Sequence, residues 1–289
     1  MISRNDPEVR HDIVLLFDVT DGNPNGDPDA GNRPRVDPET GHGLVTDVAI
    51  KRKIRDTVGL LAADESRYGI FITAGGALQT VLERSYAETA TKLDKATKDA
   101  DDARKWLCEN YFDIRMFGAV LSVGKTLALG QIRGPVQVSF ARSFDPVTPI
   151  EHTITRVAHT TLKDAQEKQG GTMGNKWTIP YGLYQATISY SASRGIQTGV
   201  SEQDLDYLYR CLVNMFDHTS SAARPMMATR RLIVFSHDDA FGRAPMPSLV
   251  ERVRVERVEG VDMPRKFSDY RVLLNDEELP EGVSVDQVV

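Results

Sequence analysis

Residues 12–55 constrain the fold of this chain more than any other stretch. They open with an apolar run at residues 13–17, which is typical of a buried β-strand. Residues 20–29 are then so rich in Gly, Pro, Asn and Asp that an irregular loop insertion is expected over residues 20–43. A segment with helical periodicity follows. The stretch therefore predicts a strand, a long polar loop and a helix in that order.

The helix after the loop carries the first candidate binding residues. Thr46 or Asp47 can cap its N-terminus. The apolar positions that would face the core are Ile50, Ile54, Val58 and Leu61. Of the basic residues in the first turns, Lys51, Arg52 and Arg55 share one flank and Lys53 lies on another. A polar loop that leads into such a helix suits a phosphate backbone, and a surface loop beside a solvated basic face explains the pattern equally well.

The composition is that of a globular protein. The chain has 289 residues, of which 40% are hydrophobic and 26% charged, and this fits one large domain. It has no apolar run of membrane-spanning length and starts without a signal-peptide pattern, so no membrane partner and a cytoplasmic location are expected. Cys108 and Cys211 lie far apart in the sequence, and both are expected to be buried in a reducing compartment.

The formal net charge of −6 argues weakly against a nucleic-acid partner. Its distribution softens that argument, because residues 251–289 contain ten Asp and Glu against six Lys and Arg. Since that part has a net charge of −4, the remaining 250 residues carry only −2. A local basic strip can therefore coexist with an acidic C-terminal part.

The whole chain, residues 1–289, is expected to form a single α+β domain with insertions. A helical insertion is expected over residues 63–130, with helices at about residues 77–98 and from residues 99–102 through Phe117. A further helix is expected at residues 201–217. Strands are expected at residues 136–140, 150–158, 177–190, 230–235, 250–258 and 270–274. A polar arm over residues 159–178 projects between two of these strands, and the acidic end from Asp276 is expected to be loosely held.

Two enzymatic alternatives remain open. Residues 119–126 fit a relaxed phosphate-loop pattern that ends in Gly124, Lys125 and Thr126. A nucleotide loop follows a strand and opens a helix, whereas a helix-like segment precedes this one. The early loop offers the carboxylates Asp21, Asp27, Asp29 and Asp37, which could hold Mg²⁺ for ribonuclease chemistry but more often form turns. The histidines and cysteines show no ligand spacing, so neither a metal, a cofactor nor a catalytic residue is expected.

Five motifs together resemble a known protein family. They are FDVTDGNPNGDP at residues 17–28, RVDPETGHGLVTD at 35–47, KRKIR at 51–55, RMFGAVL at 115–121 and GQIRGPVQ at 130–137. In these motifs the chain resembles the RNA-binding backbone subunits of CRISPR Cascade complexes. The resemblance is greatest to those of type I-C, the Csd-two group of the Cas-seven family, and it covers most of the chain.

The resemblance implies a modified RNA-recognition-motif (ferredoxin-like) palm with a helical finger insertion and a thumb hairpin. It also implies a non-catalytic subunit that oligomerises head-to-tail along a CRISPR RNA, holds its phosphate backbone, kinks it at regular intervals and presents it for pairing with target DNA. Further partners would be Cas-five-like and large Cascade subunits and, transiently, a nuclease-helicase. The residues expected to contact RNA are Thr46, Lys51, Arg52, Arg55, Arg33, Arg35, Met173 and Lys176.

The end of the arm is expected to act on the guide RNA. Gly170, Gly171 and Gly174 allow close approach of the backbone, and Met173 between them is an apolar side chain that could separate stacked bases. The resemblance places the thumb end at residues 171–174 and 181–184. An ordinary flexible loop with one exposed Met is the alternative.

Overall fold

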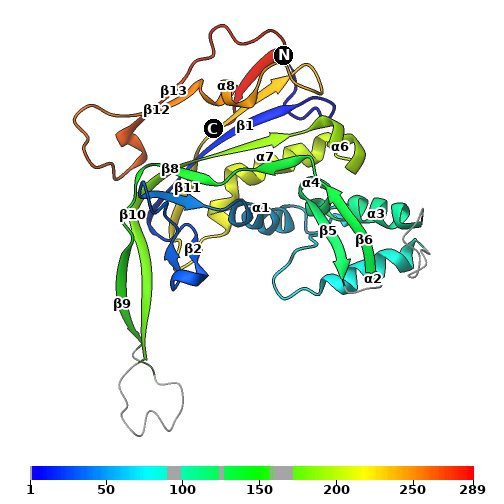
Figure 1. Cartoon of the computed structure of the whole chain (residues 1–289), viewed down its shortest axis with the longest axis horizontal. Helices are drawn as coiled ribbons and strands as arrows, with labels where there is room; N and C mark the ends of the chain where they lie inside the picture. Colours follow the sequence, from blue (N-terminus) through cyan, green and yellow to red (C-terminus); the bar gives the residue numbers. More distant parts are fainter. Residues whose placement is uncertain (1, 90–98, 124–126, 157, 159–171) are drawn as a thin grey trace.

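The computed structural model describes residues 2–89, 99–123, 127–156, 158 and 172–289. An eight-stranded sheet lies at its centre (Figure 1). Six strands follow the order β14-β11-β1-β10-β8-β4, and β7 and β9 also pair with β10. Their bounds are β1 His11–Gly22, β4 His42–Val45, β7 Val136–Val138, β8 Ala141–Pro146, β9 Ile150–Arg156, β10 Thr172–Tyr190, β11 Met226–His237 and β14 Val283–Gln287.

Strand β1 runs through the middle of this sheet, as the apolar run predicts. It pairs antiparallel with β10, where Phe17 lies opposite Tyr184, and antiparallel with β11 on its other side. The strand is buried from His11 to Val19. Its sequence is continuously apolar rather than alternating because both faces of the sheet are covered.

Helices α1 (Asp47–Leu61) and α7 (Glu202–His218) cover one face of the sheet. Their apolar faces meet the side chain of Phe17, whose ring centroid lies 5.4 Å from that of Tyr184 and 5.0 Å from that of Phe216. Both helices begin after the predicted cap residues, Thr46 and Ser201. The two helix predictions are therefore confirmed.

The C-terminal part of the chain covers the opposite face. Helix α8 (Met246–Val250) and the hairpin of β12 (Val253–Arg257) and β13 (Tyr270–Leu274) pack against Val14 and Leu16 of β1. Residues 246–250 are thus helical, and the predicted strand at 250–258 is shorter than expected. The expectation of a loosely held acidic end is wrong, because β14 pairs with β11 and completes the sheet.

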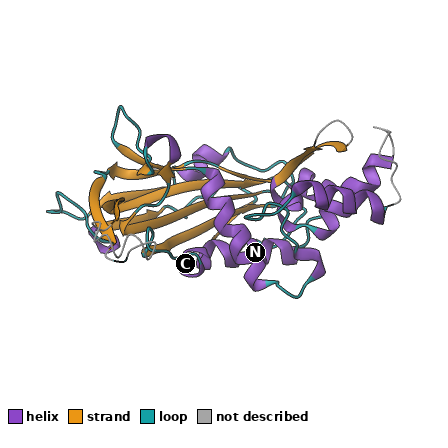
Figure 2. Ribbon diagram, turned by 90° about the horizontal axis from the view of Figure 1, so that it is seen from below, coloured by secondary structure: helices purple, strands orange, loops and turns teal. Residues whose placement is uncertain are grey.

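The described part of residues 63–130 forms a helix-rich lobe at one end of the sheet (Figure 2). The lobe has its own apolar cluster, which includes Leu82 and Leu107. Its elements are η2 Ser66–Tyr68, α2 Leu78–Glu88, α3 Asp99–Asn110, α4 Phe112–Phe117, β5 Gly118–Val123 and β6 Leu127–Arg133. The single helix predicted through Phe117 is two helices, because Tyr111 between them has extended backbone angles. The segment predicted as helix-like before residue 124 is strand β5, which pairs with β6.

A buried ion pair joins the lobe to the helix layer. Arg115 of α4 and Asp204 of α7 are both 0% exposed, with 2.6 Å between Arg115 Nη2 and Asp204 Oδ1. Arg115 Nη1 also donates to the carbonyl oxygen of Cys108. Burial alone would raise the pKa of Asp204, but the hydrogen bond and charge of Arg115 lower it. This buried ion pair is tolerated because the remaining N–H donors of the Arg115 guanidinium group are also hydrogen-bonded.

Strand β9 and the outer part of β10, residues 172–178, form an arm that projects from the sheet on the same side as the lobe (Figure 1). Residues 159–171 of the predicted arm lie outside the described residues. The expectation that residues 181–184 belong to the thumb end is wrong, because they pair with β1 and Tyr184 is fully buried. Within the described residues, none of the helices combines the length and the apolar character that crossing a membrane requires.

Candidate nucleic-acid interface

The early loop is fastened to the N-terminus of α1. It contains β2 (Gly26–Asp27), the 3-10 turn η1 (Pro28–Ala30) and β3 (Arg33–Pro34). The side-chain oxygen of Asn25 accepts a hydrogen bond from the backbone N of Thr46, at 2.9 Å. Thr46 Oγ1 in turn accepts from the backbone N of Ala49. The first part of the loop is therefore held beside the positive end of the α1 dipole.

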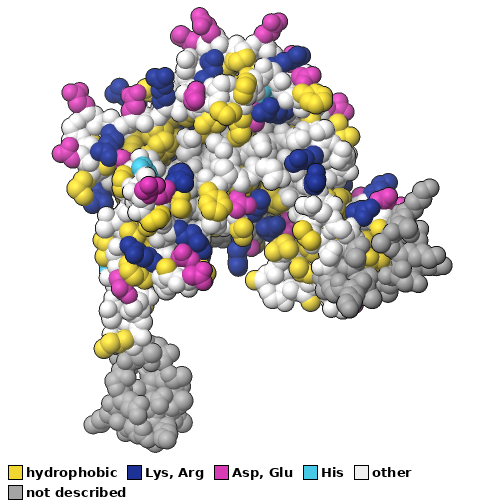
Figure 3. All heavy atoms as spheres, in the orientation of Figure 1, with side chains coloured by type: hydrophobic (Ala, Val, Ile, Leu, Met, Phe, Trp, Pro, Cys, Tyr) yellow, Lys and Arg dark blue, Asp and Glu magenta, His cyan; other side chains and the backbone are white. Residues whose placement is uncertain are grey.

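A groove of about 730 Å³, which we name the α1 groove, opens beside this helix start. Five segments that are far apart in sequence line it: the early loop, the first turns of α1, Phe140 between β7 and β8, the end of α7 and the turn before β11. Its basic side chains are Arg35, Arg52, Lys53, Arg224 and His218, and its carboxylates are Asp47 and Asp56. Figure 3 shows Lys and Arg side chains gathered between the arm and the lobe. The groove has the charge expected of an anion site.

Two arginines of the α1 groove have donors without an internal acceptor. The Nε atoms of Arg35 and Arg224 are buried, and each lacks a hydrogen-bond partner among the described residues. Arg35 makes one ion pair, from Nη2 to Asp27 Oδ1 at 3.2 Å. Buried donors without acceptors are costly, so both guanidinium groups are held beside the groove at an energetic cost.

Lys53 lies at the base of the same groove and is only 8% exposed. Its Nζ donates to Thr219 Oγ1 at 2.7 Å and lies 5.4 Å from the ring centroid of Phe216. Burial, and then the charge of Arg224, lower the pKa of Lys53 to about 8. Its ammonium group is therefore poorly compensated, and a phosphate nearby would favour the charged form.

The predicted basic flank of α1 is largely engaged in internal contacts. Lys51 Nζ lies 2.9 Å from Asp47, and Arg55 Nε lies 2.7 Å from Asp113 of α4, with the Arg55 side chain 12% exposed. Both cations also sit over the ring of Phe117. The structure thus places Lys51 and Arg55 beside the lobe, outside the set that lines the α1 groove.

Arg52 is the most accessible of the basic residues predicted on this helix. Its side chain is 68% exposed and its Nε lies 3.6 Å from Asp56, an ion pair of little strength at the surface. Among the predicted residues, Thr46, Arg52 and Arg35 come together in the α1 groove. Sequence reasoning missed Arg224 altogether, because only the packing of the turn before β11 brings it to α1.

The arm presents two different faces. In the β9–β10 pairing, Met173 and Trp177 lie on one face of the ribbon, and Lys176 lies on the other with His152. Met173 is 74% exposed. Arg33 of the early loop sits over the ring of Trp177, 5.5 Å from its centroid. Arg33 and Met173 therefore belong to one side of the arm, and Lys176 to the opposite side.

The early-loop carboxylates serve local structure. Asp27 accepts from the backbone N of Asp29 at the start of η1 and pairs with Arg35. Asp37 pairs with Arg142 at 2.8 Å, and this hydrogen bond lowers the pKa of Asp37. Asp21 lies near the end of β1 and has a positive φ of 48°, which is uncommon for residues other than glycine. Within the described part of the chain, no group of three or more His, Cys, Asp or Glu side chains is arranged to hold a metal ion.

The phosphate-loop alternative lacks its structural context. Residues 124–126 lie outside the described residues, but β5 precedes them and β6 follows them in one hairpin. A strand thus follows where a nucleotide loop requires the N-terminus of a helix. Both cysteines are buried and unpaired, and burial raises the pKa of Cys108 to about 11 and that of Cys211 to about 12. Such thiols are poor nucleophiles.

Comparisons with known proteins converge on one family. A family model described as "CRISPR-associated protein Cas7" matches residues 9–275. A curated protein of Haloferax volcanii, "CRISPR-associated protein Cas7", is 26% identical over 218 residues, which is 69% of this chain and 62% of the relative. The chain thus spans somewhat less than two thirds of that relative's length.

Two solved structures that match part of this chain belong to complexes. One, "CRISPR RNA-guided surveillance complex, pre-nicking", has 14% sequence identity and a TM-score of 0.49, with 80% of this chain and 79% of that chain covered. Another, "CRISPR RNA-guided surveillance complex", has 15% identity and a TM-score of 0.47, with 80% and 70% covered.

Proposed function

Because the chain belongs to the Cas7 family of CRISPR-associated proteins, we propose that it is the backbone subunit of a type I-C Cascade complex. In this function several copies assemble head-to-tail along a CRISPR RNA, hold its phosphate backbone and present its bases for pairing with target DNA. The other partners are the Cas-five-like and large subunits and, transiently, a nuclease-helicase. The complex works in the cytoplasm and the subunit itself is not an enzyme.

The α1 groove is the observation that carries this proposal. It combines a capped helix N-terminus with cations from three separate segments, represented by Arg35, Arg52 and Arg224. In two of them, Arg35 and Arg224, the Nε atom is buried and has no hydrogen-bond partner among the described residues. A phosphate oxygen accepts from guanidinium groups in charge-assisted hydrogen bonds. A sequence-independent hold on RNA needs contacts of this kind.

The strand order supports a palm of the RNA-recognition-motif type. In chain order β1, α1, β8, β10, α7 and β11 follow a βαββαβ pattern, and these strands lie side by side as β11-β1-β10-β8. That pattern is ferredoxin-like. RNA-recognition motifs usually bind RNA on the sheet face without helices, but α8, β12 and β13 cover that face here. The guide therefore runs past the α1 groove and not across the sheet.

The arm is proposed to be the thumb that kinks the guide. Met173 is an exposed apolar side chain on the face of the arm that also carries Trp177. Apolar side chains that insert between bases unstack them. Arg33 over the Trp177 ring fixes the base of this face against the early loop. Met173 on a fixed ribbon can separate bases at one position per subunit.

The first experiment measures the salt dependence of RNA binding. Arg52→Gln with Arg224→Gln should lower the slope of log affinity against log salt by about 1.4, because each phosphate contact to single-stranded nucleic acid contributes about 0.7. Arg254→Gln is the matched control, since Arg254 is exposed on β12 at the opposite face of the sheet. An unchanged slope in the double variant would show that RNA does not bind in the α1 groove. Arg55 is a poor target, because removing it leaves Asp113 buried without its cation.

The proposed lack of catalysis is tested with labelled RNA and Mg²⁺. The roles of Asp27 and Asp37 in local ion pairs support a structural function for the early loop. Guide RNA and complementary RNA should both remain intact after incubation with the purified chain. Cleavage that disappears in Asp27→Asn or Asp37→Asn would favour a metal-dependent ribonuclease instead.

A further inference from the structure

Two of the sequence motifs cross each other in the lobe. Gly118 pairs with Arg133 at the start of the β5–β6 hairpin, and the backbone of Gly134 passes directly over Gly118. A Cβ atom on Gly134 would lie 2.2 Å from the carbonyl carbon of Phe117 and 2.3 Å from the N of Gly118. Glycine is required at this crossing because a side chain has no room. These residues, like the buried Arg115, therefore have architectural roles.

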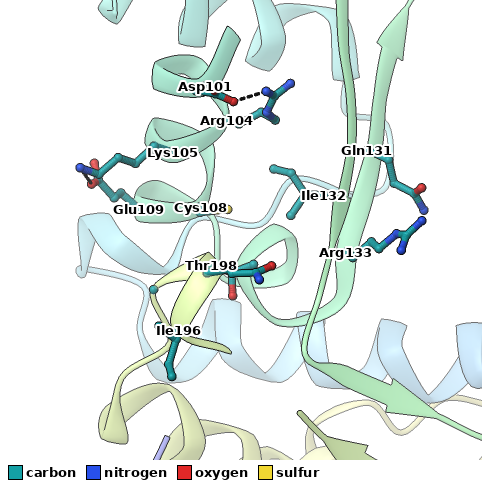
Figure 4. Close-up of a pocket in the computed structure, with 12 residues that line it drawn as sticks. Asp101, Arg104, Lys105, Cys108, Glu109, Gln131, Ile132, Arg133, Ile196 and Thr198 are labelled. Atoms are coloured by element: carbon teal, nitrogen blue, oxygen red, sulfur yellow. Dashed lines mark hydrogen bonds and ion pairs between the residues drawn. The ribbon is translucent and has the colours of Figure 1, made fainter. Parts of the chain in front are cut away.

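Other residues of the same motifs have no such role. Gln131 and Arg133 project from one face of β6, away from α3, whereas Ile132 between them points toward Cys108 (Figure 4). Ile132 is 9% exposed, and its two neighbours are exposed. Strand alternation thus divides the motif into one residue that packs the lobe and two that face outward.

The outward-facing residues line a second groove of about 440 Å³, which we name the lobe groove. It lies between the β5–β6 hairpin and α6 (Ala192–Thr198). Its polar side chains are Gln131, Arg133, Gln137 and Arg194. Its described lining includes no carboxylate, and within the described residues neither Arg133 nor Arg194 forms an ion pair. Two uncompensated guanidinium groups in one open groove attract an anion.

The lobe groove adjoins the basic flank of α1 through a single residue. Phe117 lines the lobe groove, and its ring carries Lys51 at 5.8 Å and Arg55 at 5.3 Å. Lys51 and Arg55 therefore lie between the α1 groove and the lobe groove. Both are already paired with carboxylates, Lys51 with Asp47 and Arg55 with Asp113, so the uncompensated cations of the lobe groove are Arg133 and Arg194.

We propose that the lobe groove is a second nucleic-acid site, in which Arg133 and Arg194 bind phosphodiester groups of one strand. This inference rests on the proposed function of the α1 groove and extends it to the lobe. The planar guanidinium groups match phosphate geometry, and the amides of Gln131 and Gln137 supply neutral donors and acceptors for sugar or base edges. Val120, 71% exposed at the rim, offers an apolar contact to a base.

Nucleic acid fits this site better than an acidic protein segment. The amides next to the guanidinium groups suit a ligand that alternates charged and neutral polar groups, and a nucleic-acid strand repeats that alternation at every nucleotide. The strand can be the guide RNA or the target DNA, since both offer the same phosphodiester, and two arms of the experiment separate these sources.

The test uses a double variant that carries both Arg133→Gln and Arg194→Gln. Its RNA binding is compared with that of the Arg254→Gln control. In the first arm guide RNA is bound alone, and in the second a complementary DNA strand is added to the assembled guide. If the guide is the ligand, the slope of log affinity against log salt falls by about 1.4 in the first arm. The factor by which affinity drops between 50 and 200 mM salt is then about sevenfold smaller than in the control. If target DNA is the ligand, the change occurs only in the second arm. An unchanged slope in both arms overturns the inference.

A crosslinking experiment identifies the ligand directly. Val120→p-benzoylphenylalanine places a photoreactive ketone at the rim of the lobe groove without removing either arginine. In the assembled complex, an adduct to RNA or DNA supports the inference, and an adduct confined to protein overturns it. Failure here is separable from failure of the proposed function. If the double variant Arg52→Gln with Arg224→Gln lowers the salt slope while the lobe variant does not, that result would support RNA binding in the α1 groove and reject only the proposed lobe site.

Discussion

Replacing Lys53 by Met should stabilise the free protein at neutral pH and weaken its binding of RNA. The Lys53 side chain is buried beside Phe216, and burial together with Arg224 lowers its pKa from 10.5 to about 8. Met has a similar length and can retain the packing on Phe216 without carrying a charge. The substitution therefore removes a cost of the free protein and, in the same step, a cation of the α1 groove.

The size of this cost follows from the pKa values. A native pKa of about 8 against 10.5 in the unfolded chain means that the unfolded state binds the proton more tightly. Below pH 8 both states are protonated, and the native state bears a penalty of about 3 kcal/mol. Between pH 8 and 10.5 the native state releases its proton first, so stability rises with pH. From pH 7 to pH 9.5 the expected gain is about 2 kcal/mol.

Urea unfolding of the wild type and Lys53→Met at pH 7 and pH 9.5 measures this gain. The stability advantage of the variant should shrink by about 2 kcal/mol at the higher pH, since only the wild type titrates. The lost hydrogen bond to Thr219 subtracts about 1 kcal/mol at both pH values and cancels from the comparison. Lys105→Met, on the exposed surface of α3, is the control and should show no such change. An equal difference at both pH values would refute the reasoning.

Four further outcomes are expected. Arg115→Leu leaves Asp204 buried without a cation and should lower the free energy of unfolding by about 3–5 kcal/mol in urea titrations. Gly134→Ala forces a Cβ into backbone atoms and should cost about 1–3 kcal/mol. Met173→Gln should leave thermal unfolding unchanged but remove the periodic reactive nucleotides in chemical probing of assembled guide RNA. The number of bound copies should increase with RNA length in native mass measurements, because a head-to-tail contact is open-ended.

Sequence pattern predicts those helices and strands whose capping residues and apolar periodicity lie within one short segment of the chain. Helix α1 has both a cap, Thr46, and a regular apolar stripe, and β1 has an unbroken apolar run. Strand β5 was missed because a single residue, Gly118, separates its hydrophobic residues from helix α4, and only pairing with β6 defines the strand. Strand β14 was missed because acidic residues surround Val283 and Val285, the two side chains that pack in the core.

The candidate site is harder to predict because it is assembled by tertiary contacts. The sequence shows Arg52 and Arg55 as equivalent members of a basic cluster. The structure separates them, since Asp113 from α4 captures Arg55 and leaves Arg52 at the α1 groove. Arg224 joins the groove from a turn that carries no motif. Sequence alone therefore singles out the helix that is proposed to bind RNA, but not which of its cations remain available to a ligand.

The acidic net charge is compatible with RNA binding because the charges are segregated in space. Residues 251–289, with a net charge of −4, largely cover the face of the sheet opposite α1. At physiological salt, exposed charges interact weakly beyond about 8 Å, so that part has little influence on the α1 groove. Beside the groove, Asp47, Asp56 and Asp27 are already paired with Lys51, Arg52 and Arg35, and Lys53 and Arg224 remain as the excess. The protein should therefore migrate as an anion in an electric field. It should still bind RNA, and the residues of its grooves alone should set the salt dependence of that affinity.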